Sequence, residues 1–436
     1  MKNLILLLFV FGIISCAGPS KKNIDDTPVE PYKISFNLEN LSDKDAPMMS
    51  DVIDSLEYIQ LEYNPKFPIG FIADYERPHI TNDYIFISCS HDAGLLQYKR
   101  SGEFLRKIGS YGRGPGEYLQ LRGFVIDEKM GIIYTIPNWK QSIGKYDYHS
   151  GKFLSEIPIL DLDGQPVTKN NIYNLSLLCD NYGFANLHGG NRTKMEECDV
   201  FYTIDLTNGK IVHREISKIY GTINLKIDAM MSPVMNSLFN SVWYDSQNRL
   251  NYWESLNDTI YFVNPDNSIK PRIIVYYGQY KPDKRTVAMA RNEEQMYGNN
   301  IMLHSFYESP RYLFFDHIFE GSKYILSIYD KTSGDQYLLK SMSKEEYKTG
   351  NLFYGLYNDI DGGFSNMVQY DKDMWFTSYS AIEMIDKLTP EHFEEVRSKV
   401  KYPERLDKLK KFVSGLNEGD NPVFVIAHLK QKIVKK

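Results

Sequence analysis

The sequence predicts an all-β fold, a six-bladed β-propeller, because one local pattern recurs six times along the chain. In this pattern a short polar turn precedes a strand of aromatic and β-branched residues, as is typical of sheet proteins. Tyrosine, phenylalanine and tryptophan make up 14% of the chain, which favours aromatic packing between blades. The turns begin at positions 82, 129, 181, 247, 321 and 372, so successive turns are about 47 to 74 residues apart. This spacing is somewhat above the roughly 40 to 50 residues of familiar four-stranded blades.

A second pattern inside the repeats is a β-hairpin with a glycine turn. Copies are predicted over residues 97–104, 145–153 and 202–211, with a degenerate fourth copy over 261–269. Glycine is expected there because it adopts positive φ at no steric cost. Tyr329 to Gly334 resembles a fifth copy, but it follows the strand start at Tyr324 closely. That blade is therefore expected to lack a strand or to use the turn elsewhere.

A propeller ring must be closed, and the two ends of the chain offer strands for this. Residues 52–63 are predicted to pair with residues 422–429 in one mixed blade. Two helical insertions are expected on the rim of the propeller, one near residues 282–299 and one near 389–416. The second insertion opens with Thr389 and Pro390, a helix cap and a residue suited to the first helical position, and apolar residues follow at helical spacing.

The segment from Gly109 to Tyr118 contains four glycines and a proline between two predicted strands. Such density predicts one defined, tightly folded connection. A nucleotide-binding loop would need a lysine or a helix after the glycines, and here a strand follows. The loop is either purely structural or also touches a ligand.

The N-terminus has the pattern of a signal sequence. Lys2 precedes an apolar run from Leu4 to Ile14, which is too short to span a bilayer. Residues 13–16 resemble the lipobox of bacterial lipoproteins, in which Cys16 would become the lipidated first residue; the alternative is an ordinary secretory signal. We therefore expect a signal peptide over residues 1–15, a lipidated tether over 16–50 and the propeller over 51–436.

Charge and cysteine content narrow the function classes. The formal net charge is -6, and the chain lacks a basic tract, so nucleic acid is not an expected partner. Removing Cys16 from the four cysteines leaves Cys89, Cys179 and Cys198, an odd number, so at least one is unpaired. A bridge between Cys179 and Cys198 is not expected, because they fall at opposite ends of a sheet. No cofactor is expected, and we expect a monomer.

Two motifs carry a family resemblance. The motifs are Gly112 to Tyr118 and Asn358 to Gly363. Through them the chain resembles uncharacterised six-bladed β-propeller lipoproteins of Gram-negative bacteria, which are similar in fold to NHL-repeat and TolB-like propellers. The resemblance implies the fold and a place in the cell envelope. We expect a lipid anchor in the outer membrane, with the propeller either in the periplasm or exposed at the cell surface. It implies no activity.

Strand order predicts where a ligand binds. In a four-stranded blade, the turns joining strands one to two and three to four lie on one face, which we call the short-turn face. The connections joining strands two to three and one blade to the next lie on the other, the long-loop face. Long ordered loops on a rigid scaffold concentrate binding residues. The sequence therefore predicts a site on the long-loop face near the channel mouth, with Arg113 as first candidate and Asp359 and Asp361 as second candidates.

Metal and catalytic motifs are weak. Asp161 to Gly164 and Asp359 to Gly362 pair carboxylates with glycine, but neither continues as a calcium-binding EF-hand. We expect ordinary turns and no metal. The nine histidines show no helical ligand spacing, although a site built from one residue per blade would not be visible in the sequence.

Two function classes compete. The first is a cell-envelope lipoprotein that binds a ligand or protein partner, with glycans among the candidate ligands. The alternative is a propeller hydrolase or lyase with a site dispersed around the central channel. Visible nucleophile, metal and cofactor patterns are lacking, so the binding class is favoured, while the question of enzymatic activity stays open.

Overall fold

The computed structural model describes most of the chain beyond the N-terminal region. The described residues are 30–69, 78–89, 94–167, 172–187, 199–216, 240–245, 247–254, 257–283, 295, 297–343, 346, 356–365, 368–369 and 373–431.

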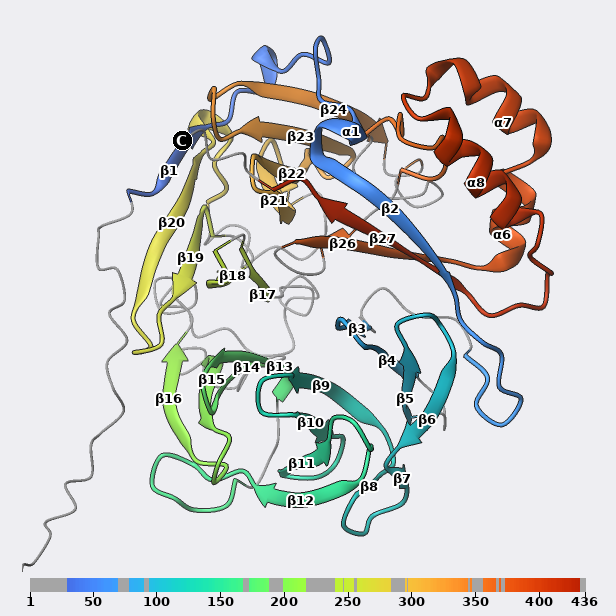
Figure 1. Ribbon diagram of the computed structural model, residues 1–436. Coiled ribbons are helices and arrows are strands. Elements are labelled where there is room, and N and C mark those ends of the chain that lie inside the picture. The colour runs from blue at the N-terminus through green and yellow to red at the C-terminus, as the bar shows by residue number, and fades with distance from the viewer. Residues whose placement is uncertain are drawn as a thin grey trace, which may run out of the picture.

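Six sheets stand around a central axis (Figure 1), and each is an antiparallel meander running from the centre to the rim. This arrangement confirms the six-bladed propeller. Blade 1 contains β3 (His79–Ile80), β4 (Tyr84–Cys89), β5 (Gly94–Lys99) and β6 (Phe104–Ile108). Blade 2 contains β9 (Leu121–Asp127), β10 (Ile132–Pro137), β11 (Ser142–Asp147) and β12 (Phe153–Pro158). Blade 3 contains β13 (Ile172–Cys179), β14 (Tyr182–Leu187), β15 (Asp199–Asp205) and β16 (Ile211–Ile216).

The remaining blades repeat this order, except that the last one combines both ends of the chain. Blade 4 contains β17 (Asn240–Tyr244), β18 (Leu250–Glu254), β19 (Thr259–Val263) and β20 (Ile269–Tyr276). Blade 5 contains β21 (Ile301–Glu308), β22 (Tyr312–Phe319), β23 (Lys323–Asp330) and β24 (Gln336–Ser343). Blade 6 contains β25 (Val368–Gln369), β26 (Met374–Tyr379), β27 (Val423–Leu429) and, as its outer strand, β2 (Ile53–Gln60).

Pairing of β2 with β27 closes the ring, as predicted. The two strands are antiparallel, with Ile53 opposite Leu429 and Gln60 opposite Val423. β27 also pairs with β26 from Val423 to His428, so a C-terminal strand holds the N-terminal strand in the sheet.

The segment before β2 is more ordered than the tether expected over residues 16–50. β1 (Tyr32–Ser35) pairs in parallel with β20 as a fifth strand of blade 4. The chain then passes through the 3-10 helix η1 (Leu38–Asn40), bridges from Ser42 to Tyr337 of blade 5, and enters β2 through α1 (Met49–Val52). Strand pairing corrects this boundary, because the propeller contacts begin at Tyr32.

The predicted C-terminal insertion is helical and packs on blade 6 (Figure 1). It contains α7 (Pro390–Val396), the 3-10 helix η5 (Arg397–Lys399) and α8 (Pro403–Val413). A further helix, α6 (Ala381–Lys387), precedes the predicted range of 389–416. As predicted, the Thr389 hydroxyl caps α7, accepting from the His392 N–H at 3.3 Å, and Pro390 lies in its first turn. A second proline starts α8, so the run forms two helices. Within the described part of the chain, none of the helices has the length and apolar character needed to cross a bilayer.

The other insertion falls mostly outside the described residues. The 3-10 helix η4 (Gly278–Tyr280) precedes the predicted range of 282–299. Ile301–Glu308, which begins just after the predicted insertion, is β21, the inner strand of blade 5.

Blade 5 also corrects the repeat. The turn at 321–322 joins β22 to β23, the second and third strands. The turn equivalent to the other five is Ser309 to Arg311, before β22. The Tyr329 to Gly334 turn joins β23 to β24, like the other hairpins, so blade 5 has all four strands. Its second strand was missed because a proline-containing turn precedes it and a glycine turn follows it.

The hairpin glycines do more than form turns. Gly102, Gly151 and Gly209 have φ values of 92°, 67° and 82°, as predicted. Each also lies against the end of the preceding blade's outer strand, and a Cβ at Gly102 would collide with the Gln60 carbonyl oxygen. A Cβ at Gly209 would collide with the Pro158 carbonyl oxygen in the same way. These close approaches join neighbouring blades.

Candidate functional site

The glycine-rich loop forms one defined connection between blades 1 and 2, as predicted. Its two short strands, β7 (Ser110–Tyr111) and β8 (Glu117–Tyr118), pair in parallel. The Gly114 N–H donates to the Glu117 carboxylate at 2.8 Å. The buried Tyr118 hydroxyl donates to the Ile108 carbonyl and accepts from the Leu95 N–H at 2.9 Å. These bonds fix both ends of the loop to blade 1.

A turn of blade 2 faces this loop. It joins β10 to β11 through Asn138, Trp139, Lys140 and Gln141. The Asn138 N–H donates to the Gln120 carbonyl at 2.7 Å, which holds the turn beside the entry to β9. The Lys140 ammonium donates to the Gly114 carbonyl at 2.8 Å and to Glu156 at 3.1 Å. Lys140 therefore ties the turn to the loop.

Loop and turn enclose a pocket of about 530 Å³, which is within the size range of small-ligand sites. Its lining residues are Gly112, Arg113, Tyr118, Leu119, Asn138, Trp139 and Lys140. The pocket lies on the long-loop face, the face on which the sequence predicts a ligand site. It does not lie at the channel mouth, because β7 and β8 are at the rim beside β6 and β12 (Figure 1).

Arg113 is the first sequence candidate, and its guanidinium is exposed at this pocket. Among the described residues it has no hydrogen-bond or ion-pair partner. By contrast, the other cation of the pocket, Lys140, has its charge offset by Glu156. The pocket therefore has one uncompensated positive charge, which stands on a rigid loop.

Trp139 is the residue that sequence reasoning missed. Its side chain is 78% exposed, and its φ of 69° lies in the left-handed region. A bulky residue at positive φ is an outlier, with a cost of order 1–3 kcal/mol. The other described non-glycine residues with positive φ are Asp45, Asn181, Asn248, Asn267 and Glu320. The available signal was a tryptophan in a polar turn between two predicted strands.

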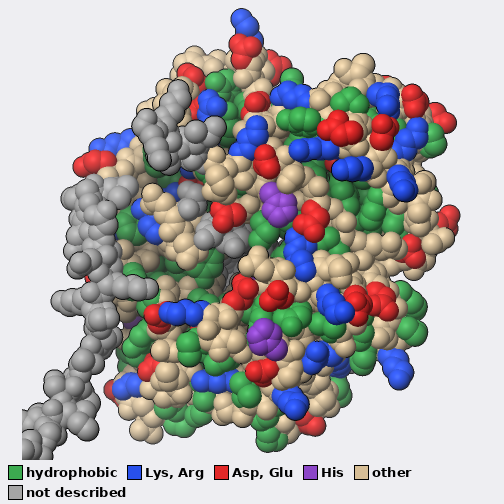
Figure 2. All heavy atoms as spheres, in the orientation of Figure 1, with side chains coloured by type: hydrophobic (Ala, Val, Ile, Leu, Met, Phe, Trp, Pro, Cys, Tyr) green, Lys and Arg blue, Asp and Glu red, His purple; other side chains and the backbone are tan. Residues whose placement is uncertain are grey.

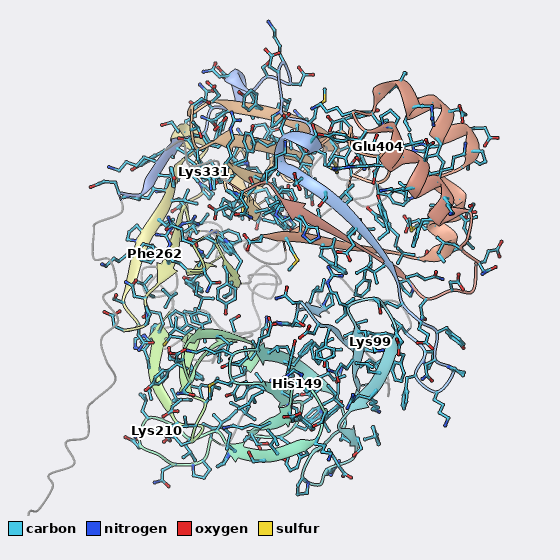
Figure 3. All side chains as sticks on the ribbon, in the orientation of Figure 1. Lys99, His149, Lys210, Phe262, Lys331 and Glu404 are labelled. Atoms are coloured by element: carbon cyan, nitrogen blue, oxygen red, sulfur yellow. The ribbon has the colours of Figure 1, made fainter. Side chains whose placement is uncertain are left out.

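Charges elsewhere on the molecule are mixed or paired. Figure 2 shows acidic and basic side chains interspersed over the face in view. Lys99 and Lys331, labelled in Figure 3, belong to turn regions of the short-turn face, and they are ion-paired with Glu103 and Glu308. The unpaired Arg113 differs from these lysines.

The second sequence candidates, Asp359 and Asp361, are buried between blade 6 and its helices. The Asp359 carboxylate accepts from the Ser50 N–H at 2.8 Å and from its hydroxyl at 2.6 Å, and it pairs with Lys401 at 2.9 Å. Burial alone would raise the pKa of Asp359, but the hydrogen bonds from Ser50 and Lys401 outweigh burial and hold the pKa below its ordinary value. This carboxylate is occupied within the fold.

Asp361 is occupied in the same way. Its carboxylate accepts from the Tyr58 hydroxyl at 2.8 Å, from the Asn358 amide at 2.8 Å and from the Gly363 N–H at 3.0 Å. Burial raises its pKa despite these donors. Neither aspartate is available to a ligand in this structure, which corrects their assignment as binding residues. Both instead hold the closing strand β2 or its leading helix in place.

A buried charge network between blades 4 and 5 is also structural. Arg272 donates to Glu308 at 2.6 Å and to Asn251 at 3.0 Å, and it lies 3.3 Å from Asp245. Lys331 donates to the same Glu308 oxygen at 2.8 Å. These charges neutralise one another inside the ring, as buried ions require.

The remaining candidates form no metal or disulfide site in the described residues. Asp161 accepts from the Asp163 and Gln165 N–H groups, which makes an ordinary turn. Groups of three or more potential metal ligands are absent from the part of the chain that the structure describes. Cys89 and Cys179 form no disulfide bond with another described residue, whereas Cys16 and Cys198 lie outside the described residues.

Fold and pocket together define a six-bladed β-propeller with an open pocket on its long-loop face. The chain belongs to the family described as a domain of unknown function, DUF4934, which matches residues 33–428. A search of curated proteins found no match.

The solved structures that are similar to this chain include the following three. One is a Bacteroides fragilis protein described as exported, with 16% identity, a TM-score of 0.60 and coverage of 92% of this chain and 99% of that one. A DUF4221 family member from Bacteroides vulgatus has 10% identity, a TM-score of 0.45 and coverage of 87% and 97%. Virginiamycin B lyase from Staphylococcus aureus has 14% identity, a TM-score of 0.36 and coverage of 66% and 73%. The first of these similarities shows a shared fold.

Proposed function

We propose that this protein is a ligand-binding propeller of the cell envelope, and that the pocket between the 109–118 loop and the 138–141 turn is its binding site. One observation carries the proposal: the pocket presents an exposed, strained Trp139 beside the partner-free Arg113.

Folding stability does not account for Trp139. An indole at 78% exposure buries little apolar surface, and its backbone conformation costs free energy. Asparagine or glycine would suit this turn better. Strain that the fold does not need is typical of a binding site.

The protein's own fluorescence offers a direct test. The other three tryptophans, Trp243, Trp253 and Trp375, are 7%, 1% and 1% exposed, so quenching by acrylamide reports mainly on Trp139. A ligand in the pocket should protect this fluorescence, and envelope extracts fractionated by size and charge provide the ligands for a screen.

Two variants make the screen specific. Trp139→Asn removes the fluorescent reporter, so binding to this variant is measured by calorimetry. Binding should be weakened without a lower melting temperature. Arg113→Ala should also weaken binding. Lys129→Ala is its control, because Lys129 is an exposed cation of blade 2 on the opposite, short-turn face, where it pairs with Asp180. If ligands bind equally well to wild type and Trp139→Asn, the pocket is not the site.

Attachment to a membrane through Cys16 is the second part of the proposal. The apolar run and the small residues around Cys16 support it. Cys16→Ala should release the protein from the membrane fraction. A variant that stays with the membrane after a carbonate wash contradicts lipid attachment at this cysteine.

The path of β1 supports an orientation for the anchored protein. The chain enters the propeller at the outer edge of blade 4, where β1 pairs with β20. The pocket lies across the ring, between blades 1 and 2 (Figure 1). An anchor on this segment would hold the blade 4 side near the membrane and leave the pocket open to ligands.

A second candidate function, catalysis at the central channel, is favoured by one pair of residues. His304 on the inner strand β21 has its Nδ1 atom 3.1 Å from the buried Asp316 carboxylate, a geometry that orients an imidazole as a general base. Suppose that the wild-type protein converts a bound ligand chemically. If the ligand still protects Trp139 in His304→Ala but is no longer converted, catalysis by this pair is supported. Conversion that survives in His304→Ala would exclude this pair.

A further inference from the structure

We infer that the ligand of this pocket is an acidic saccharide, a glycan with a hexuronate residue whose ring stacks on Trp139 and whose carboxylate pairs with Arg113. This inference rests on the proposed function, since it names the ligand class of the same pocket.

The polar groups of the pocket support this assignment by elimination. The Asn138 amide accepts from the Arg122 guanidinium at 2.8 Å and donates to the Gln120 amide at 3.1 Å. The Lys140 ammonium is shared between Gly114 and Glu156. These groups are committed to the protein, so they do not offer the array of hydrogen bonds that recognises a neutral sugar by its hydroxyls.

Arg113 is the polar group left over, and its chemistry selects a carboxylate. A guanidinium presents a planar fork of donors that matches a carboxylate in a bidentate pair. The nearest acidic side chain on the loop, Glu117, instead accepts from the Gly114 N–H, and the carboxylate of Glu156 is held by Lys140 and Ser142. No carboxylate among the described residues pairs with Arg113, so an anionic ligand can supply one.

Trp139 indicates a ring rather than an extended acidic peptide. An indole exposed on a turn offers a flat apolar surface, which suits the apolar face of a pyranose. Gly112, on the opposite wall beside Arg113, adds no side chain to the pocket.

The experiment uses oligosaccharides of galacturonate, glucuronate and mannuronate with the intact protein. Binding is measured by calorimetry and by protection of Trp139 from acrylamide. At least one hexuronate oligosaccharide should bind, and its methyl ester, which keeps the rings and removes the charge, should bind about 10- to 100-fold more weakly.

The variants separate the two contacts. Arg113→Ala should weaken binding of the acid about 10- to 100-fold and leave the weak binding of the ester unchanged. Arg113→Lys should fall between wild type and Arg113→Ala, because it retains the charge but loses the fork. Trp139→Asn should weaken the acid and the ester alike, and Lys129→Ala should bind as wild type does.

Several outcomes overturn the inference. It fails if no hexuronate oligosaccharide protects Trp139, if acid and ester bind equally, or if poly-glutamate binds as tightly as the uronates. In each case the proposed function still stands when some other envelope ligand protects Trp139 in wild type and, by calorimetry, binds more weakly to Trp139→Asn. If no fraction of the envelope extract protects Trp139, both the inference and the proposed function fail.

Discussion

Arg113 and the pair Asp359 and Asp361 lie on the same kind of connection, between one blade and the next, yet they have opposite environments. The two carboxylates are buried and accept hydrogen bonds from Ser50, Tyr58 and other residues. The Arg113 guanidinium is exposed and lacks a partner among the described residues. A buried carboxylate whose hydrogen bonds are all made within the protein has a structural role in closing the ring. An exposed charge without a partner, beside a strained aromatic residue, is available to bind a ligand.

The ring-closing region and the pocket also differ in how far apart in the chain their contacting residues lie. Closure brings together segments that are more than 300 positions apart, as in the bond from Ser50 to Asp359, so each lost contact opens the ring. The pocket is built from one loop and one turn of adjacent blades. Changes in the closing region should therefore act on stability, and changes in the pocket should act on binding.

Removing the C-terminal strand should give the largest effect. Deletion of residues 422–436 takes away β27, the partner of both β2 and β26, so the whole propeller should lose its cooperative melt. Deletion of residues 432–436 alone is the control and should leave the melt unchanged. An unchanged cooperative melt in the longer deletion would contradict closure through β27.

Gly102→Ala should destabilise the protein by about 2–4 kcal/mol, because the new Cβ has positive φ and meets the Gln60 carbonyl oxygen of the neighbouring blade. Gly131→Ala is the matched control. Gly131 also has positive φ, but no atom lies within 4 Å of the position that its Cβ would take, so we expect a cost of about 1 kcal/mol. Chemical denaturation measures both, and equal costs would show that the contact between blades is not tight.

Asp359→Ala should cost about 2 kcal/mol at neutral pH, since it removes the acceptor of Ser50 and Lys401 and Lys401 is half-exposed. The pKa of Asp359 is lowered in the folded protein. Its contribution should therefore be complete above its ordinary pKa of 3.8 and disappear as the pH falls below that value. Denaturation curves of wild type and variant should converge in acid, and a constant difference would show that the charge of Asp359 does not stabilise the fold.

The pocket variants should have the smallest effect on stability. Arg113→Ala should leave the melting temperature unchanged, and Trp139→Asn should leave it unchanged or raise stability by up to about 1 kcal/mol, because asparagine tolerates positive φ. Differential scanning calorimetry is sensitive enough for this comparison. A clear loss of stability in either variant would assign the residue to the fold, as for Asp359.

Features that depend on neighbouring residues could be predicted from the amino-acid sequence. Turn and strand composition predicted six blades, Gly102, Gly151 and Gly209 predicted the hairpins, and Thr389 with Pro390 predicted a helix start. Blade 5 was misplaced by one strand, because a glycine turn before β23 gave a stronger local signal than the proline turn before β22.

Burial and pairing of side chains depend instead on contacts between segments that are distant in the chain. Asp359 and Arg113 are both polar residues in glycine-containing connections, and nothing adjacent to them in the chain distinguishes their roles. Asp359 meets Ser50 from the other end of the chain, while Arg113 meets no acidic partner in the described structure. Trp139 was overlooked for the same reason: most aromatic residues of a propeller fill the space between blades, and exposure depends on contacts that form only when the ring closes.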